Sequence, residues 1–376
     1  MREVGLALGR ANVAAIYLAH GTFAGSDASG ILGEVDRWLP RLGATLRQTM
    51  KQAIDALAGD AGNYTAEYAR TFEESINRGA ADALPVRLFH WSSENCHIGR
   101  ANAAVRMIDE LQSWRLPPGK RILLWGHSHA GNVFALMTNL LSGDREKIEA
   151  FFDAAEPYYR WPLFHKIDLP VWKRVREKLL EGATGGVSPE AAARTADTAV
   201  APGGNAVAPV VDIVTFGTPL RYGWDLAGCG RLLHVVYHRA AATCPEYRAP
   251  FPPNLPDVLA AVDGDYVQQF GIAGTNIMPS VLTWRSCWAD WRLNRLLQPG
   301  LRARELLSRL RCGCRVPDAG TTLLVDYGPL PGHVAQHLAG HAVYTRLEWL
   351  AYHAKLTVRW LYGDGETTTG GDYCRE

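Results

Sequence analysis

Six short runs of apolar residues recur along the chain, each about as long as a β-strand. Most are rich in Val, Ile and Leu and show little polar alternation, which is typical of strands buried on both faces of a parallel sheet. The runs cover residues 13–20, 86–91, 121–127, 211–217, 232–238 and 321–328. We therefore expect a mostly parallel sheet that forms the centre of the fold.

Segments with helical periodicity lie between or after several of these runs. The clearest are residues 100–114, 129–142 and 343–356. In the first, Met107 and Leu111 stand four positions apart and fall on the same helical face. Because strands and helices alternate, the pattern predicts an α/β fold with right-handed crossovers.

Three segments are longer than a simple crossover requires, and insertions of this size over an α/β core often form caps or lids. The predicted core covers residues 1–143, 210–274 and 319–360, with a helical insertion at 34–85; a cap or lid insertion covers 144–209, a second helical insertion covers 275–318, and a flexible tail covers 361–376. The two later insertions mix aromatic with basic side chains. We expect them to cover a functional site at the carboxyl ends of the strands. They would do so either as a lid that contacts a membrane peripherally or as a fixed cap with buried Trp residues.

Composition narrows the class of protein. Of 376 residues, 47% are hydrophobic and 20% are charged, as expected for a globular chain, and the net charge of +1 gives no reason to expect nucleic-acid binding. The N-terminal residues lack the layout of a signal peptide, and no run of about 18 apolar residues predicts a membrane span. We therefore expect a cytoplasmic protein, with signal-less export or peripheral membrane association as alternatives.

One short motif carries candidate chemistry. Residues 121–125 read as a strand, and the small-residue stretch Gly126-His127-Ser128-His129-Ala130-Gly131 leads from it into a helix. A serine at a sharp strand-to-helix turn exposes its hydroxyl beside the first amides of the helix, as a nucleophile requires. Ser128 is therefore the predicted nucleophile, although an incidental serine in a tight turn would fit the same letters.

A serine nucleophile also needs an oxyanion hole, a base and an orienting acid. The first predicted strand ends in His20-Gly21-Thr22-Phe23. Its Gly lets the loop backbone approach a substrate oxygen. The expected oxyanion donors are the backbone N–H groups of Thr22 or Phe23 and of His129, the residue after the nucleophile.

At this point the chain resembles the α/β-hydrolase superfamily, in particular its lipase-like members. The resemblance rests on the loop at 20–23, the Ser128 motif and the stretch TFGTPL at 215–220. It covers the core but none of the insertions, and it implies a shortened sheet that lacks the first two strands of the full superfamily fold. It also implies a Ser-Asp-His order along the chain.

The resemblance leaves three candidates for the acid. The Asn-Asp pattern of some lipases is missing after the fifth apolar run, at residues 234–247. Gly264-Asp265-Tyr266-Val267 resembles the Gly-Asp-x-Val segment of many superfamily acids, so Asp265 is favoured over Asp263. Asp225, which follows TFGTPL, is the third candidate. A solvated loop carboxylate is the alternative reading for each.

Three histidines spaced four apart, His333, His337 and His341, offer the base. Glycines and a proline argue against one continuous helix, and no Cys or carboxylate nearby completes a metal site, so no metal is expected. His341 is favoured because it follows Gly340 and precedes the last helical segment, where the superfamily histidine lies. His333 is the alternative.

These residues predict a serine hydrolase that cleaves carboxylic esters, with lipid-like esters favoured, and that needs no metal or organic cofactor. The alternatives are a thioesterase, amidase or peptidase on the same fold, or a non-catalytic interaction protein on a hydrolase scaffold. A polar cluster after the second strand, Glu94, Asn95, His97 and Arg100, is expected to brace loops at the rim of the site rather than to act in catalysis.

Overall fold

The computed structural model describes most of the predicted core and part of each insertion. The described residues are 1–22, 62–80, 82–160, 169–183, 209–242, 244–245, 247–250, 254–273, 279, 283–298, 305–330 and 337–363. Phe23, His333 and nearly all of the predicted tail at 361–376 lie outside them. None of the described helices is long and apolar enough to cross a membrane.

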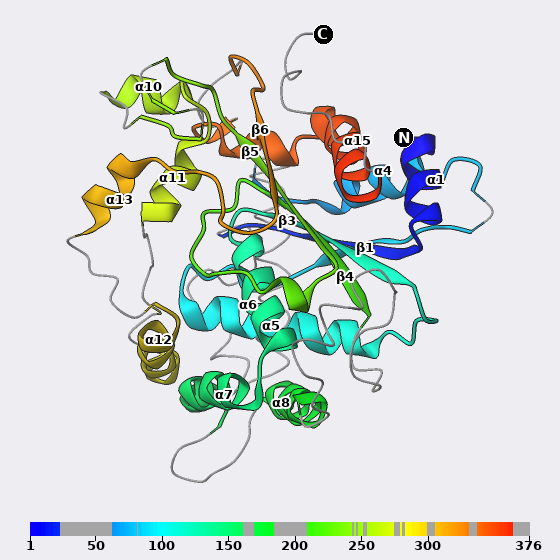
Figure 1. Ribbon diagram of the computed structural model, residues 1–376, viewed down its shortest axis with the longest axis vertical. Helices are drawn as coiled ribbons and strands as arrows, with labels where there is room; N and C mark the ends of the chain where they lie inside the picture. Colours follow the sequence, from blue (N-terminus) through cyan, green and yellow to red (C-terminus); the bar gives the residue numbers. More distant parts are fainter. Residues whose placement is uncertain are drawn as a thin grey trace.

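Within the described residues, six strands form a single parallel sheet, as the apolar runs predict (Figure 1). The strands are β1 (Val13–Ala19), β2 (Val86–Phe89), β3 (Arg121–His127), β4 (Val210–Phe216), β5 (Arg231–Tyr237) and β6 (Thr321–Val325). Their order across the sheet is β2-β1-β3-β4-β5-β6. The α/β class with a parallel sheet is therefore confirmed.

The continuous apolar character of the strands reflects burial on both faces. In β1, Tyr17 packs into one hydrophobic cluster, whereas its neighbours Ile16 and Leu18 pack into a second cluster on the opposite face. All three side chains are almost fully buried. Alternate side chains of a strand point to opposite faces, so a strand covered on both sides needs apolar residues at every position.

Two layers of helices provide this cover (Figure 1). On one face lie α5 (His97–Ser113) and α6 (Ala130–Ser142), with α7 (Arg145–Tyr159), α8 (Pro170–Ala183) and α12 (Trp284–Leu297) packed outside them. The other face is covered by α1 (Arg2–Arg10), α4 (Ala66–Ile76) and α15 (Leu347–Tyr362). The remaining elements are η1 (Leu226–Gly228), α10 (Leu255–Leu259), α11 (Tyr266–Ala273), α13 (Leu306–Cys312) and η3 (His341–Thr345).

One helical segment was not predicted from the sequence, and another differs from its prediction. The apolar N-terminus contains a helix, α1, which buries Val4 and Leu8 against the sheet before β1 begins. The helix expected at 343–356 is a short 3-10 turn, η3, followed by α15, because Arg346 adopts an extended backbone conformation between them.

The strand order creates a topological switch point at the centre of the sheet. The chain passes from β1 to β2 on one side and returns to β3 on the other side of β1. In open α/β sheets, the crevice outside the carboxyl ends of strands at such a point is the usual ligand site. Gly21 follows β1 there and Ser128 follows β3, so the topology places both beside this crevice.

Candidate active site

Ser128 occupies a strained turn between β3 and α6. Its backbone is left-handed, with φ of 56°, which a residue with a side chain rarely adopts and which costs about 1–3 kcal/mol. Hydrogen bonds hold this conformation: Ser128 N donates to Phe216 O at 2.8 Å, and Thr218 Oγ1 donates to Ser128 O at 2.9 Å. The neighbouring strand β4 and its loop thus fix the turn.

The glycines around Ser128 are needed because neighbouring side chains leave no room for a Cβ atom. A Cβ on Gly126 would stand 2.5 Å from the ring of Phe134, and a Cβ on Gly131 would stand 2.2 Å from Thr218 Oγ1. Both contacts are shorter than real Cβ atoms make. The motif therefore packs β3, α6 and the loop after β4 closely enough to hold Ser128 in its turn.

The loop after β1 closes on the serine from the other side. A Cβ on Gly21 would stand 2.7 Å from Ser128 Cβ and 3.2 Å from Ser128 Oγ. Thr22, one residue further, is half-buried. His129 is buried at the N-cap position of α6. Two of the three predicted oxyanion donors therefore belong to segments that flank Ser128, and the third, Phe23, lies outside the described residues.

The predicted acid and base are in contact. His341 Nδ1 donates to Asp265 Oδ2 at 2.7 Å, and both side chains are buried. The other carboxylate oxygen, Asp265 Oδ1, accepts from Gln268 N at 2.9 Å at the start of α11. With one oxygen bonded to the helix amide and the other to the imidazole, the carboxylate fixes the orientation and the tautomer of the ring.

The opposite ring nitrogen of the base is available. His341 Nε2 is buried and makes no hydrogen bond to the described residues, and none joins it to Ser128 Oγ. His127, which precedes the serine, has its ring 4.5 Å from that of His341, and His127 Nε2 lies 3.1 Å from His341 O. These contacts bring η3 against the nucleophile turn. Nucleophile–base hydrogen bonds are often long until a substrate binds.

The alternative acids have other partners. Asp263 Oδ2 accepts from Tyr266 Oη at 2.6 Å, and Asp225 Oδ1 accepts from Ala227 N at the start of η1. Neither contacts a histidine in the described residues. Of the alternative bases, His333 lies outside the described residues. His337 is buried three residues before Gly340, and the described part of the chain holds no cluster of three metal-binding side chains.

Two histidines beside the serine are held neutral. Burial lowers the pKa of His127 well below its usual value, and the neighbouring His341 lowers it further. Burial also lowers the pKa of His129 well below its usual value, assisted by the positive charges of Arg100 and Arg221. Both His127 and His129 are therefore uncharged at neutral pH.

The polar cluster after β2 forms a bracing network, as expected. Arg100 donates from Nε to Tyr222 Oη at 2.8 Å and from Nη1 to Asn95 Oδ1 at 3.0 Å. His97 Nδ1 lies 2.9 Å from the same Tyr222 Oη, and burial lowers the pKa of His97 to about 3. The network joins α5 to the loop after β4. Its contact with Asn294 of α12 attaches that helix to the rim.

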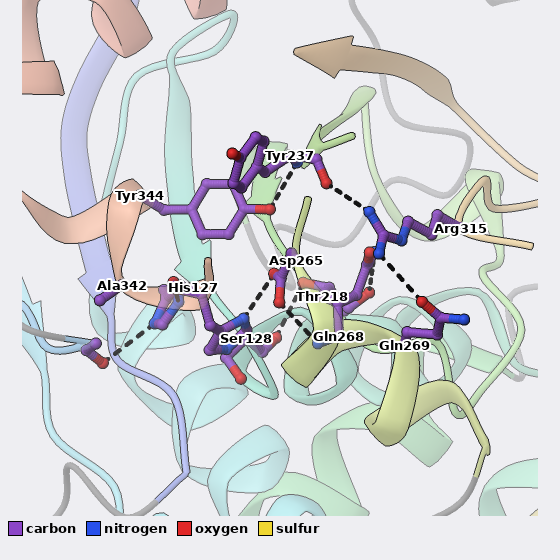
Figure 2. A network of polar contacts seen from close by, with 12 residues as sticks. His127, Ser128, Thr218, Tyr237, Asp265, Gln268, Gln269, Arg315, Ala342 and Tyr344 are labelled. Atoms are coloured by element: carbon purple, nitrogen blue, oxygen red, sulfur yellow. Dashed lines mark hydrogen bonds and ion pairs between the residues drawn. The ribbon is translucent and has the colours of Figure 1, made fainter. Parts of the chain in front are cut away.

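Three supporting residues were not anticipated from the sequence. Gly217, in the TFGTPL stretch, has φ of 56°, and a Cβ there would stand 2.7 Å from Asp265 Oδ2. Tyr344 Oη accepts from Tyr237 N at 2.7 Å (Figure 2). Arg315 is fully buried beside the segment that carries Asp265. Only the glycine has a local signal, its place in a small-residue turn after a strand.

The buried Arg315 joins the end of β5 to residues 263–269, the segment that carries Asp265. Its Nη1 donates to Tyr237 O at 2.9 Å and to Asp263 O at 2.7 Å, and its Nη2 lies 3.1 Å from Gln269 Oε1 (Figure 2).

Comparisons of the chain with protein-family models, with curated proteins and with solved structures found no match.

Proposed function

We propose that the protein is a serine hydrolase of the α/β-hydrolase type that cleaves carboxylic esters, with lipid-like acyl esters as the favoured substrates. One observation carries the proposal. A serine in a left-handed strand-to-helix turn shares the carboxyl edge of the sheet with a buried Asp265–His341 pair. Strain of this kind concentrates at functional sites, and the pair is the orienting half of a catalytic triad.

The proposed reaction follows from these positions. Ser128 Oγ attacks the ester carbonyl while His341 Nε2 takes its proton and then passes it to the leaving alcohol. Asp265 keeps the proton of the ring on Nδ1 and stabilises the imidazolium that forms. The N–H of His129 and an N–H of the loop after Gly21 stabilise the oxyanion, and water then hydrolyses the acyl-enzyme by the same route.

The runner-up functions differ in the leaving group or in the absence of chemistry. A thioesterase, amidase or peptidase would use the same triad. A binding protein on a hydrolase scaffold would need neither the strained turn nor the orienting carboxylate. The preference for lipid-like esters rests on the TFGTPL stretch and the aromatic insertions.

Covalent labelling tests the proposal. A fluorophosphonate probe should label the wild-type chain, and Ser128→Ala should abolish labelling while the thermal unfolding transition is retained. Ser93→Ala is the matched control, since Ser93 is also buried with a left-handed backbone, φ of 60°, but lies in the loop after β2. Labelling that persists in Ser128→Ala would remove the assignment.

A substrate series then separates the reaction classes. Turnover should be measured with p-nitrophenyl esters of increasing chain length, the matching thioesters and anilides, and phospholipids. Esters should be cleaved fastest, with a preference for longer acyl chains. Faster cleavage of thioesters or anilides would reassign the leaving group, and no turnover by a chain that takes up the probe would indicate an untested substrate class.

A further inference from the structure

α12 presents tryptophan to solvent on one face. Trp284, Trp288 and Trp291 are 51%, 43% and 55% exposed. They are spaced i, i+4 and i+7, and Arg295 follows at i+11, so the four side chains form one stripe along the helix. Together the half-exposed rings offer on the order of 350 Å² of amphipathic surface. Exposed patches of this size are often functional.

The opposite face of α12 already holds the helix in place. Arg285 donates from Nε to Pro157 O at 2.8 Å at the end of α7, and Asp290 Oδ1 accepts from Ile98 N at 2.9 Å at the start of α5. Ala289 and Leu293 are fully buried between these helices. The expectation of a cap with buried Trp residues is therefore wrong for α12: the helix is packed on the core, but its three tryptophans face outward.

The exposed face is cationic as well as aromatic. Arg295 is exposed and its guanidinium lies 4.9 Å from the centre of the Trp291 ring. The side chain of Arg292, the residue after Trp291, is half-buried. The one acid of α12, Asp290, points inward and is buried. The face therefore combines indole rings with positive charge and has no exposed carboxylate on the same helix.

This combination fits one kind of surface. Tryptophan favours the boundary between water and hydrocarbon because its ring is apolar and its N–H is polar. Arginine beside it attracts anionic headgroups, and each charge strengthens binding about fivefold. A stable dimer buries about 800 Å² on each partner, more than this stripe provides.

We propose that the Trp284–Trp288–Trp291–Arg295 face of α12 docks the protein onto anionic phospholipid bilayers. The helix would lie parallel to the surface with its tryptophans at headgroup depth. α12 packs against the start of α5, at the sheet edge that carries Ser128 (Figure 1). Docking would thus bring the candidate site close to lipid. It is independent of the proposed chemistry, because a chain that cannot hydrolyse esters would still bind.

Vesicle co-sedimentation tests the proposal in the full-length Ser128→Ala chain, which leaves lipid intact. Vesicles of phosphatidylcholine with 30% phosphatidylglycerol are compared with pure phosphatidylcholine. We expect binding to the anionic vesicles, with a blue shift of tryptophan fluorescence and weakening at high salt. Trp288→Ala/Trp291→Ala should weaken binding tenfold or more, and Arg295→Glu roughly 10- to 30-fold.

The matched control is Leu6→Ala/Arg10→Glu on α1, which removes an exposed apolar and an exposed basic side chain from the other face of the sheet. It should bind anionic vesicles as the parent does. Equal loss in the control, equal binding to neutral and anionic vesicles, or full binding by the tryptophan variant would overturn the proposal. So would a dimer in light scattering that Trp288→Ala/Trp291→Ala converts to monomer, since the occupant would then be a second copy.

Discussion

A Cβ atom on Gly21 would stand 2.7 Å from the Cβ of Ser128 and 3.2 Å from its hydroxyl oxygen. Gly21→Ala should therefore push the loop after β1 away from the nucleophile. Displacement of an oxyanion donor by about 1 Å costs roughly 100-fold in turnover. Steady-state hydrolysis of a soluble ester measures this effect, and circular dichroism verifies the fold.

Gly9→Ala provides the control for that substitution. Gly9 lies in α1, and a Cβ there would meet no atom within 4 Å. The added methyl should stabilise the helix by about 0.5–1 kcal/mol and leave turnover unchanged. If Gly21→Ala also kept full turnover, the loop after β1 would have no part in the chemistry.

The two neighbouring aspartates should respond differently to neutralisation. Asp265→Asn leaves the imidazole of His341 free to adopt the wrong tautomer and should reduce kcat about 10⁴-fold. Asp263→Asn keeps a hydrogen-bond partner for Tyr266 and should change kcat only slightly. Parallel pH–rate profiles would distinguish them, and wild-type rates in Asp265→Asn would transfer the role of the acid to another carboxylate.

Arg315 should matter for stability and, because it holds the segment that carries Asp265, for turnover. Arg315→Met removes three hydrogen bonds from a charged donor, two to main-chain carbonyls and one to the buried amide oxygen of Gln269, and should lower the free energy of unfolding by about 3–5 kcal/mol. Arg311→Met, at an exposed position of α13, should stay within about 0.5 kcal/mol of wild type. Denaturant titration measures both.

Arg315→Lys tests the same role if Arg315→Met does not fold. The ammonium retains the charge but cannot reach all three acceptors, so an intermediate loss of stability is expected, together with a lower kcat and an unchanged KM. Wild-type kcat in Arg315→Lys would mean that the buried guanidinium supports the fold without positioning Asp265.

Stability should fall steeply below pH 6.5. Burial lowers the pKa of His97 and of His353 to about 3 and that of His234 to about 4. In this range the unfolded chain binds protons that the folded chain does not, so the free energy of unfolding decreases as pH falls. At pH 5 each of these histidines should have lowered the free energy of unfolding by about 2 kcal/mol relative to neutral pH.

His353→Leu isolates one of these contributions. It removes the buried ring and its 2.8 Å contact with Tyr327 Oη, so the variant should be less stable at pH 7.5. Its stability should nevertheless change less between pH 7.5 and 5 than that of wild type. Unfolding free energies at the two pH values measure this, and equal differences for both proteins would show that His353 takes up a proton without unfolding.

Local sequence patterns were sufficient to predict the strands and the turn that contains Ser128. A strand buried on both faces is a continuous apolar run, and the turn at Ser128 is encoded by small residues within six positions. Asp265 and His341 were selected by the resemblance to the α/β-hydrolase superfamily, and the structure brings these two side chains together. Their catalytic roles stay predictions, as do those of Thr22 and Phe23.

Features that depend on distant contacts could not be read from the chain. Arg315 is separated from Tyr237 by 78 positions and from Gln269 by 46, so no periodicity marks it as a buried residue. The exposure of the tryptophans on α12 was equally hidden. Their mixed aromatic and basic pattern fits a buried face or an open one, and only the contacts of Arg285 and Asp290 decide which side of the helix is inward.

The contact between η3 and the nucleophile turn has a consequence for folding. His127 and His341 are 214 positions apart in the sequence, and Asp265 and His341 are 76 apart. Closing such long loops is slow and entropically unfavourable, so these contacts form after the local helices and the central strands. During refolding, secondary structure should therefore return before probe labelling of Ser128. Recovery of labelling would then mark the completion of folding.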